Sequence, residues 1–228
     1  MQGDELLATL QSLGNPTAAA VVLRHAQRFP IIDPSEPTLA EITPAGAAAA
    51  EALGRRIAGV DRVRIFHSPV KRCRQTAECL AQGAATAGLT VELVGPRAVL
   101  GVDYILDLDE AGRLSQLHGN GFVRLWFTGQ LAEAIIRPAA QIAAEKLDYL
   151  THCLQEPGGT ARRLDLHVSH DWNVIILREY MLQVRHEAAG WLTYLDGLTL
   201  VQRPEGLQAV YREHSRIQPL PWEFRAAG

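Results

Sequence analysis

Short apolar runs alternate with longer helical segments along this chain of 228 residues, and that alternation limits the folds it can adopt. The first run, residues 18–23, consists mainly of small and β-branched apolar residues and is too short for a buried helix, as is typical of a strand covered on both faces. The predicted strands span 18–23, 63–66, 90–94 and 164–168. Because helical segments lie between them, the sequence predicts an α/β fold with a mostly parallel central sheet and helices on both faces.

The helical segments have identifiable ends. Thr43 and Ser68 are suitable N-caps, since each precedes a proline at the first helical position. Pro138 interrupts the longest segment, which predicts a kink or break near Arg137. The predicted helices span 4–13, 44–58, 69–81, 131–154 and 172–182.

Two regions depart from the alternating pattern. Residues 95–130 contain several glycines and mix acids with large apolar residues, and we interpret them as a lid or insertion over the sheet. Two alternating runs around Pro204, Glu205 and Gly206 predict a hairpin near the C-terminus. The chain has no internal repeat or low-complexity linker, and its 47% hydrophobic residues can fill a core. We therefore predict a single domain, 1–228, with a lid at about 95–130.

The composition excludes several classes of function. A net charge of −3 provides no global basic field for nucleic acid or an anionic membrane. Cys73, Cys79 and Cys153 form no CxxC pair and no zinc-finger spacing, so neither a disulfide framework nor a structural zinc site is indicated. The N-terminus carries acids where a signal peptide carries basic residues, and no window approaches the roughly 18 apolar residues of a membrane span. We expect a soluble, cytoplasmic protein.

Polar residues follow the end of each predicted strand. They occur in RHAQR after 18–23, in HSPVKRCRQT after 63–66, in the acids of VDYILDLDE after 90–94, and in SHDWN after 164–168. In an open α/β sheet, ligands bind in the crevice outside the carboxyl ends of the strands. These four segments therefore predict one shared site.

The residue types in these segments suit phosphate chemistry. The guanidiniums of Arg24, Arg28 and Arg72 offer fork-shaped sets of donors that match phosphate oxygens. The neutral imidazole of His25 or His170 could attack phosphorus and form a phosphohistidine that water then cleaves. The leaving alkoxide also needs a proton. Asp171, adjacent to His170 in sequence, is a candidate general acid.

Three motifs carry a resemblance to a known family. Residues 24–30, RHAQRFP, resemble the RHGxRxP signature of the histidine phosphatase superfamily in its acid phosphatase and phytase-like branch. The pair His170-Asp171 is similar to the HD pair of that branch. Residues 68–77, SPVKRCRQTA, resemble the SPxxRxxQTA element common in the phosphoglycerate mutase-like branch. The chain therefore mixes features of both branches.

The resemblance implies a role for each matching residue. It implies that His25 is the nucleophile and Asp171 the proton donor, with no metal or organic cofactor. The phosphoryl group would be bound by Arg24, Arg28, Arg72 and His170. Mutase-like members take a Glu donor from the region after the third strand, where this chain has Asp103, Asp107, Asp109 and Glu110. We rank Asp171 first and Asp103 second.

Ala26 stands where the family has Gly. A side chain there would be costly if the backbone required a positive φ, although we expect the loop to tolerate it. We predict that the protein is a phosphomonoester hydrolase acting on a small-molecule phosphate ester. Two alternatives remain: a phosphomutase that passes the phosphoryl group to a second hydroxyl, and a non-catalytic phosphate-binding relative, which Ala26 motivates. The sequence predicts neither the substrate nor the oligomeric state.

Overall fold

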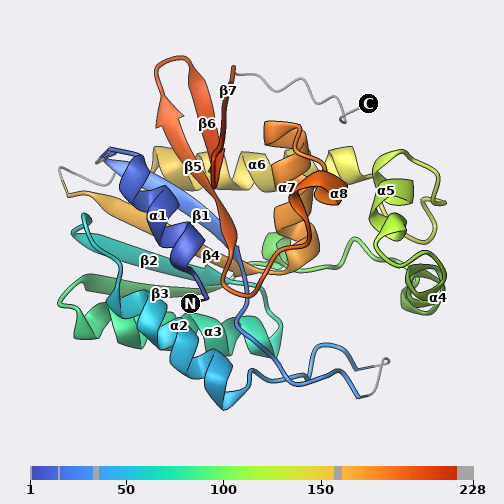
Figure 1. Ribbon diagram of the computed structural model, residues 1–228, viewed down its shortest axis with the longest axis horizontal. Helices are drawn as coiled ribbons and strands as arrows, with labels where there is room; N and C mark the ends of the chain where they lie inside the picture. The colour runs from blue at the N-terminus through green and yellow to red at the C-terminus, as the bar shows by residue number, and fades with distance from the viewer. Residues whose placement is uncertain (1, 15, 33–35, 157–160, 220–228) are drawn as a thin grey trace.

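A single sheet of seven strands runs through the molecule in the order β3-β2-β4-β1-β5-β6-β7 (Figure 1). The computed structural model describes residues 2–14, 16–32, 36–156 and 161–219. The strands are β1 Ala18–Arg24, β2 Arg62–His67, β3 Thr90–Pro96, β4 Arg163–Ser169, β5 Gly197–Arg203, β6 Gly206–Tyr211 and β7 His214–Gln218. All four strands predicted before the C-terminal hairpin are present, with bounds within two residues of those expected.

The parallel half of the sheet brings strand ends to one level. Strand β4 pairs in parallel with both β1 and β2, and β2 pairs in parallel with β3. In this register Arg24 lies beside Ser169, and His67 lies beside Val168. The residues that follow β1, β2 and β4 therefore emerge together at one edge. Strands β5, β6 and β7 extend the sheet in antiparallel fashion from β1.

Helices cover both faces of this sheet, which confirms the predicted fold class (Figure 1). The helices are α1 Asp4–Ser12, α2 Pro44–Arg55, α3 Lys71–Thr86, α4 Leu108–His118, α5 Gly121–Phe127, α6 Ala139–Gln155, α7 Asp171–Leu182 and α8 His186–Ala189, with a 3-10 helix η1 at Ala98–Leu100. Side chains of β1 alternate between two apolar clusters, as the pleat of a strand requires. Ala20 and Val22 pack with α6 and α7, whereas Val21 and Leu23 pack on the side of α1, α2 and α3.

Helix ends follow the expected chemistry in two of three places. Thr43 caps α2, because its hydroxyl accepts a hydrogen bond from the Gly46 N–H at 3.0 Å. Helix α6 begins only after Pro138, so the predicted break is confirmed and the predicted helical segment before it is wrong. The start predicted for α3 is also too early, because Val70 is the N-cap. Ser68 instead accepts a hydrogen bond from the Val70 N–H at 3.3 Å.

Residues 95–130 contain η1, α4 and α5, and the last two lie at one end of the molecule beyond α7 (Figure 1). Four side chains of α5, Phe122, Val123, Trp126 and Phe127, are buried in the same apolar cluster as α6 and α7. The Phe122 ring stacks on that of Trp172, with 5.3 Å between centroids. This segment is thus anchored beside the first turn of α7, and its action as a lid stays a prediction.

The predicted C-terminal hairpin is confirmed as β5 and β6, which turn where Arg203 pairs with Gly206. Strand β7 was not predicted, because four of its five residues are polar and only every other one is partly shielded from solvent. None of the helices in the described ranges combines the length and hydropathy that a bilayer span requires.

Candidate active site

The site forms where β1, β2 and β4 end. The His25 N–H donates to the Ser169 carbonyl at 3.0 Å, and the Ser68 N–H donates to the Val168 carbonyl at 2.9 Å. These bonds hold the chain segments after β1 and β2 against the end of β4. His25, Ser68 and His170 are consequently neighbours although about a hundred residues separate the last two in sequence.

His25 is a neutral imidazole with a defined tautomer. Its Nδ1 lies 2.8 Å from the Ala26 carbonyl oxygen, which can only accept, so Nδ1 carries the proton. Its Nε2 accepts a hydrogen bond from Nε of Arg72 at 3.0 Å and therefore holds the lone pair. Burial, and next the charge of Arg72, lowers the pKa of His25 to about 3. The nitrogen that faces Arg72 is thus available as a nucleophile throughout the physiological range.

Arg72 connects the two histidines. Its Nε donates to His25, its Nη2 donates to Nδ1 of His170 at 3.1 Å, and its Nη1 donates to the Pro37 carbonyl at 2.7 Å. No carboxylate of the described residues forms an ion pair with this buried guanidinium. Burial lowers the pKa of Arg72 from its ordinary value, since a buried cation without an anion is unfavourable. An anionic ligand would supply the missing charge.

His170 has the complementary tautomer. Because its Nδ1 accepts from Arg72, its Nε2 carries the proton and donates to Oγ of Ser68 at 3.0 Å. Burial, and next the charge of Arg72, lowers the pKa of His170 well below the ordinary value. The two imidazoles meet edge to face, with 5.7 Å between centroids. Ser68 thus orients His170 from the side opposite Arg72.

Arg24 and Asp171 form the second charged part of the site. Nη2 of Arg24 lies 3.1 Å from Oδ2 of Asp171, and both side chains are partly exposed. Nη1 of Arg24 donates to the Leu192 carbonyl at 2.6 Å. The Arg24 guanidinium lies over the ring of Tyr194, 4.3 Å from its centroid. Asp171 also accepts from Nε1 of Trp191 at 3.0 Å.

The segment 190–196 therefore belongs to the site, although its residues were not predicted from the sequence. Strand β5 runs antiparallel to β1, with Gly197 beside Leu23, so the residues before β5 lie where β1 ends. Leu195 adopts a left-handed φ of 61° here, and its N–H donates to the Arg24 carbonyl. The predicted hairpin was the available signal, because pairing it with β1 places Trp191 and Tyr194 at this edge.

Ala26 fits its position without strain. It is not among the described non-glycine residues with positive φ, and its methyl group is buried in the apolar cluster beneath the site. Its N–H donates to Oγ1 of Thr76 at 3.0 Å. Gly46 of α2 packs so closely on this loop that a Cβ there would lie 2.2 Å from the Gln27 carbonyl oxygen. The loop is therefore fixed by α2 and α3, and a glycine at 26 is not required.

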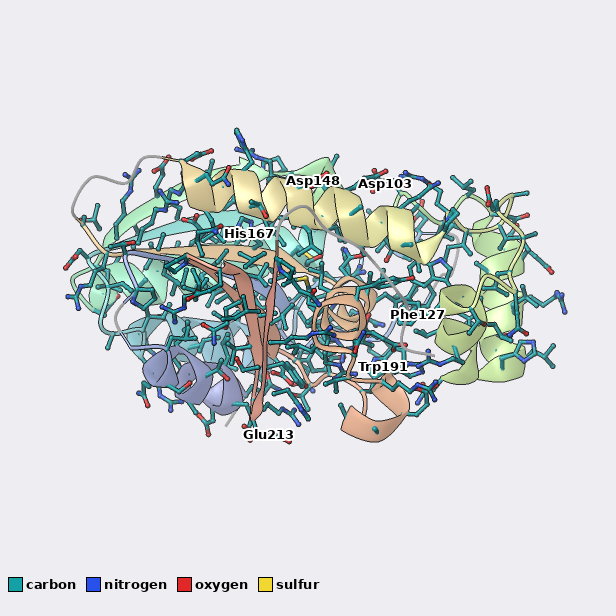
Figure 2. The ribbon with its side chains drawn as sticks, turned by 90° about the horizontal axis from the view of Figure 1, so that it is seen from above. Asp103, Phe127, Asp148, His167, Trp191 and Glu213 are labelled. Carbon is teal, nitrogen blue, oxygen red and sulfur yellow. The ribbon has the colours of Figure 1, made fainter. Side chains whose placement is uncertain are left out.

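Two candidate residues lie apart from the group formed by Arg24, His25, Arg72, His170 and Asp171. Arg28 is half-buried and donates to the Phe29 carbonyl at 2.8 Å, although its charge also contributes to the lowered pKa of Arg72. Asp103 is exposed. In Figure 2 Asp103 lies along the α6 side of the molecule, whereas Trp191, the partner of Asp171, lies near α7 and α8. The charge of Asp171 therefore acts on His25, whereas the hydrogen bond of Arg28 goes to its sequence neighbour Phe29.

Comparison with known families gives the same assignment as the motifs. The sequence profile described as histidine phosphatase superfamily (branch 1) matches residues 21–93, which include RHAQRFP and SPVKRCRQT. These residues carry the same likeness to the histidine phosphatase superfamily that the motifs predicted. His170 and Asp171 lie outside the matched residues. The likeness of this pair to the HD pair of the acid phosphatase and phytase-like branch therefore stays a resemblance. No curated protein sequence shows significant similarity to this chain.

Solved structures share the fold. Bacillus stearothermophilus YhfR superposes with a TM-score of 0.61 at 16% identity, over 85% of this chain and 96% of that one. A mycobacterial glucosyl-3-phosphoglycerate phosphatase in complex with inorganic phosphate gives 0.54 at 17% identity, over 85% and 96%. A variant of phosphoserine phosphatase from Entamoeba histolytica, in complex with phosphoserine, gives 0.54 at 15% identity, over 92% and 98%. These neighbours share the fold of this chain, and two of them are named as phosphatases.

Proposed function

We propose that this protein is a phosphomonoester hydrolase that works through a phosphohistidine at His25. The observation that carries this proposal is the buried contact between Nε of Arg72 and the unprotonated Nε2 of His25. It combines a nucleophile with a guanidinium that has no carboxylate partner in the described part of the chain. Phosphoryl transfer depends mainly on positioning and on stabilising negative charge, and this pair supplies both.

The reaction would proceed in two steps. Nε2 of His25 forms a bond to phosphorus while the bond from phosphorus to the ester oxygen breaks, and Asp171 gives that oxygen a proton. A water oxygen then forms a bond to phosphorus while the bond between phosphorus and Nε2 of His25 breaks, Asp171 takes a proton from the water, and inorganic phosphate leaves. Arg24, Arg72 and His170 would bind the phosphoryl oxygens, with Arg28 at the rim. The substrate must first displace the existing hydrogen bond between Arg72 and His25.

Asp171 is the better supported of the two candidate donors. Its carboxylate contributes to the electrostatic environment of His25, whereas Asp103 is exposed and lies toward α6. A phosphate dianion at Arg24 would compete with Asp171 for the same guanidinium. Substrate binding would therefore free the Asp171 carboxyl from its ion pair just where a proton is needed.

The substrate is proposed to be a small phosphate ester. The neighbours named as glucosyl-3-phosphoglycerate phosphatase and phosphoserine phosphatase support this substrate class. We further propose that the chain works as one domain and that 95–130 acts as a lid, since Phe122 stacks on Trp172 next to Asp171. The three free cysteines fit the reducing conditions of the cytoplasm, the location that we propose.

Trapping of the phosphoenzyme tests the proposed function. On mixing with p-nitrophenyl phosphate, the protein should release nitrophenol continuously in water and yield an acid-labile, base-stable phosphoenzyme after rapid denaturation. A phosphomutase would form the phosphoenzyme but need an acceptor alcohol for steady turnover. A non-catalytic relative would bind phosphate and release no nitrophenol. Either of the last two results would replace hydrolysis with the corresponding alternative.

The proton donor can be tested through the leaving group. Asp171→Asn should slow hydrolysis of an alkyl phosphate far more than that of p-nitrophenyl phosphate, because nitrophenolate leaves with little need of a proton. We expect the difference to be about 10²-fold, the lower range for general acid catalysis. The measurement is kcat/KM for both esters, with Asp103→Asn as the matched carboxylate control. The donor would be Asp103 if Asp171→Asn slowed both esters equally while Asp103→Asn slowed the alkyl phosphate selectively.

A further inference from the structure

A second cluster of polar side chains lies apart from the candidate active site, where α5, α7 and α8 meet. It comprises Glu179 in the last turns of α7, His186 and Glu187 at the start of α8, and Arg124 of α5. One potential ligand atom from each of Glu179, His186 and Glu187 lies within 4.8 Å of the others. Glu179 and His186 are buried, whereas Glu187 reaches solvent.

Two atoms of this cluster are buried without a hydrogen-bond partner. They are Oε2 of Glu179 and Nδ1 of His186, which lie 3.5 Å apart. Nε2 of His186 lies 3.1 Å from the Asn120 carbonyl oxygen, an acceptor, so Nε2 carries a proton. In the neutral imidazole, Nδ1 then directs a lone pair at the carboxylate. Two buried electron-rich atoms in this arrangement repel each other unless a proton or a metal cation lies between them.

Arg124 holds the carboxylates of Glu179 and Glu187 in place through hydrogen bonds. Its Nε and Nη2 each donate to Glu187 at 2.8 Å, and its Nη1 donates to Oε1 of Glu179. Oε2 of Glu179 is left for another partner, and the oxygens of Glu187 each retain a second lone pair. Oriented carboxylates with a hydrogen-bonded outer partner are typical of metal sites.

We propose that Glu179, His186 and Glu187 bind a divalent transition metal ion, with zinc as the best match. One imidazole nitrogen and two carboxylate oxygens are common zinc ligands, whereas calcium and magnesium prefer oxygen alone. The two carboxylates balance the charge of the ion. Glu187 is 48% exposed, which gives the ion a path from solvent and leaves room for a bound water. The site is independent of the proposed phosphatase reaction.

The ion would join α7 and α8 directly, and α5 would be attached to its ligands through Arg124 and the Asn120 carbonyl. Asn120 and Arg124 belong to the 95–130 segment, Glu179 lies near the end of α7, and His186 begins α8. The His186 ring also meets that of Trp191 edge to face, with 6.1 Å between centroids, and Trp191 donates to Asp171. We therefore assign the ion a structural role, because it would fasten the proposed lid to the helices beside the site.

Titration of the untagged, metal-free protein with zinc chloride tests the proposal. Calorimetry should give one equivalent of zinc, and zinc should raise the melting temperature. Cobalt should bind with visible d–d bands but without a thiolate-to-cobalt band, since no cysteine is among the ligands. Glu187→Gln and His186→Ala should weaken zinc binding by roughly 100-fold or more, because loss of an outer partner alone costs about 10–100-fold.

His214→Ala is the matched control. His214 pairs with Glu213 at 3.4 Å on the surface of the C-terminal hairpin region, and Figure 2 shows Glu213 far from Phe127 of α5. This variant should bind zinc like the wild type. Absence of binding at millimolar zinc, equal binding by Glu187→Gln and the wild type, or a thiolate band with cobalt would each overturn the proposed site. If His186→Ala fails to fold, the exposed Glu187→Gln still decides the outcome.

Discussion

His25→Ala should lower kcat for p-nitrophenyl phosphate by roughly 10⁴-fold or more, because removal of a covalent nucleophile leaves only binding and electrostatic stabilisation. The imidazole contributes its unprotonated Nε2 to the site, and no other described side chain donates to or accepts from Nε of Arg72. The variant should also yield no acid-labile phosphoenzyme. The measurements are steady-state kinetics and phosphoenzyme trapping, with circular dichroism to verify the fold.

His67→Ala is the control for this first prediction. His67 is also buried at a strand end. Its Nδ1 lies 2.8 Å from the Ser68 carbonyl oxygen, just as Nδ1 of His25 lies 2.8 Å from the Ala26 carbonyl oxygen. The two substitutions remove similar buried contacts, but His67 makes no hydrogen bond to Arg72. The control should retain a kcat within about tenfold of the wild-type value, a difference of roughly 1.4 kcal/mol in activation free energy. Near-normal turnover by His25→Ala would disprove the phosphohistidine mechanism.

Arg72→Ala should reduce kcat/KM by roughly 10²–10³-fold, about 3 kcal/mol of transition-state stabilisation, which is the usual cost of removing one donor to a developing oxyanion. Its guanidinium contacts His25 and His170 simultaneously, so the loss should affect both nucleophile and phosphate binding. Arg72→Lys should recover only part of the activity, because an ammonium restores the charge but not the fork of donors.

Arg74→Ala provides the comparison for Arg72. Arg74 lies two residues further along α3, where its side chain is 56% exposed and pairs with Glu78. Residues two apart do not share a helix face, so Arg74 should make no contact with the phosphoryl group. Its substitution should leave kcat/KM nearly unchanged. A loss below tenfold for Arg72→Ala would exclude Arg72 from direct contact with the transferred group.

The elements that the sequence predicts best are those whose burial is uniform. Strand β1 is buried at all but its ends and reads as a continuous apolar run, whereas β4 is buried at every residue although Arg163, Asp165 and His167 alternate with its apolar residues. Strand β7 has no such run, because its formation depends on pairing with β6 rather than on its own residues. Similarly, Ser68 looks like a helix cap locally, but His170 uses its hydroxyl and α3 begins later. Tertiary contacts decide both cases.

The same contrast holds for the site. His25, Arg72 and His170 were predicted because each follows a strand of the parallel half of the sheet, and parallel strands end at a common edge. Trp191 and Tyr194 precede an antiparallel strand, so their position becomes apparent only once β5 is paired with β1. The proposed metal ligands were also missed, because their approach depends on how α5 packs against α7 and α8.

The shared register of β1, β2 and β4 has a consequence for how this chain can change. Each strand advances about 3.3 Å per residue and alternates its faces, so deletion of one residue within β4 would displace His170 by that distance and reverse its side. Substitutions on the helices would leave this alignment intact. Strand length should therefore be the property of this chain least able to vary, more restricted than the identity of most residues that cover the sheet.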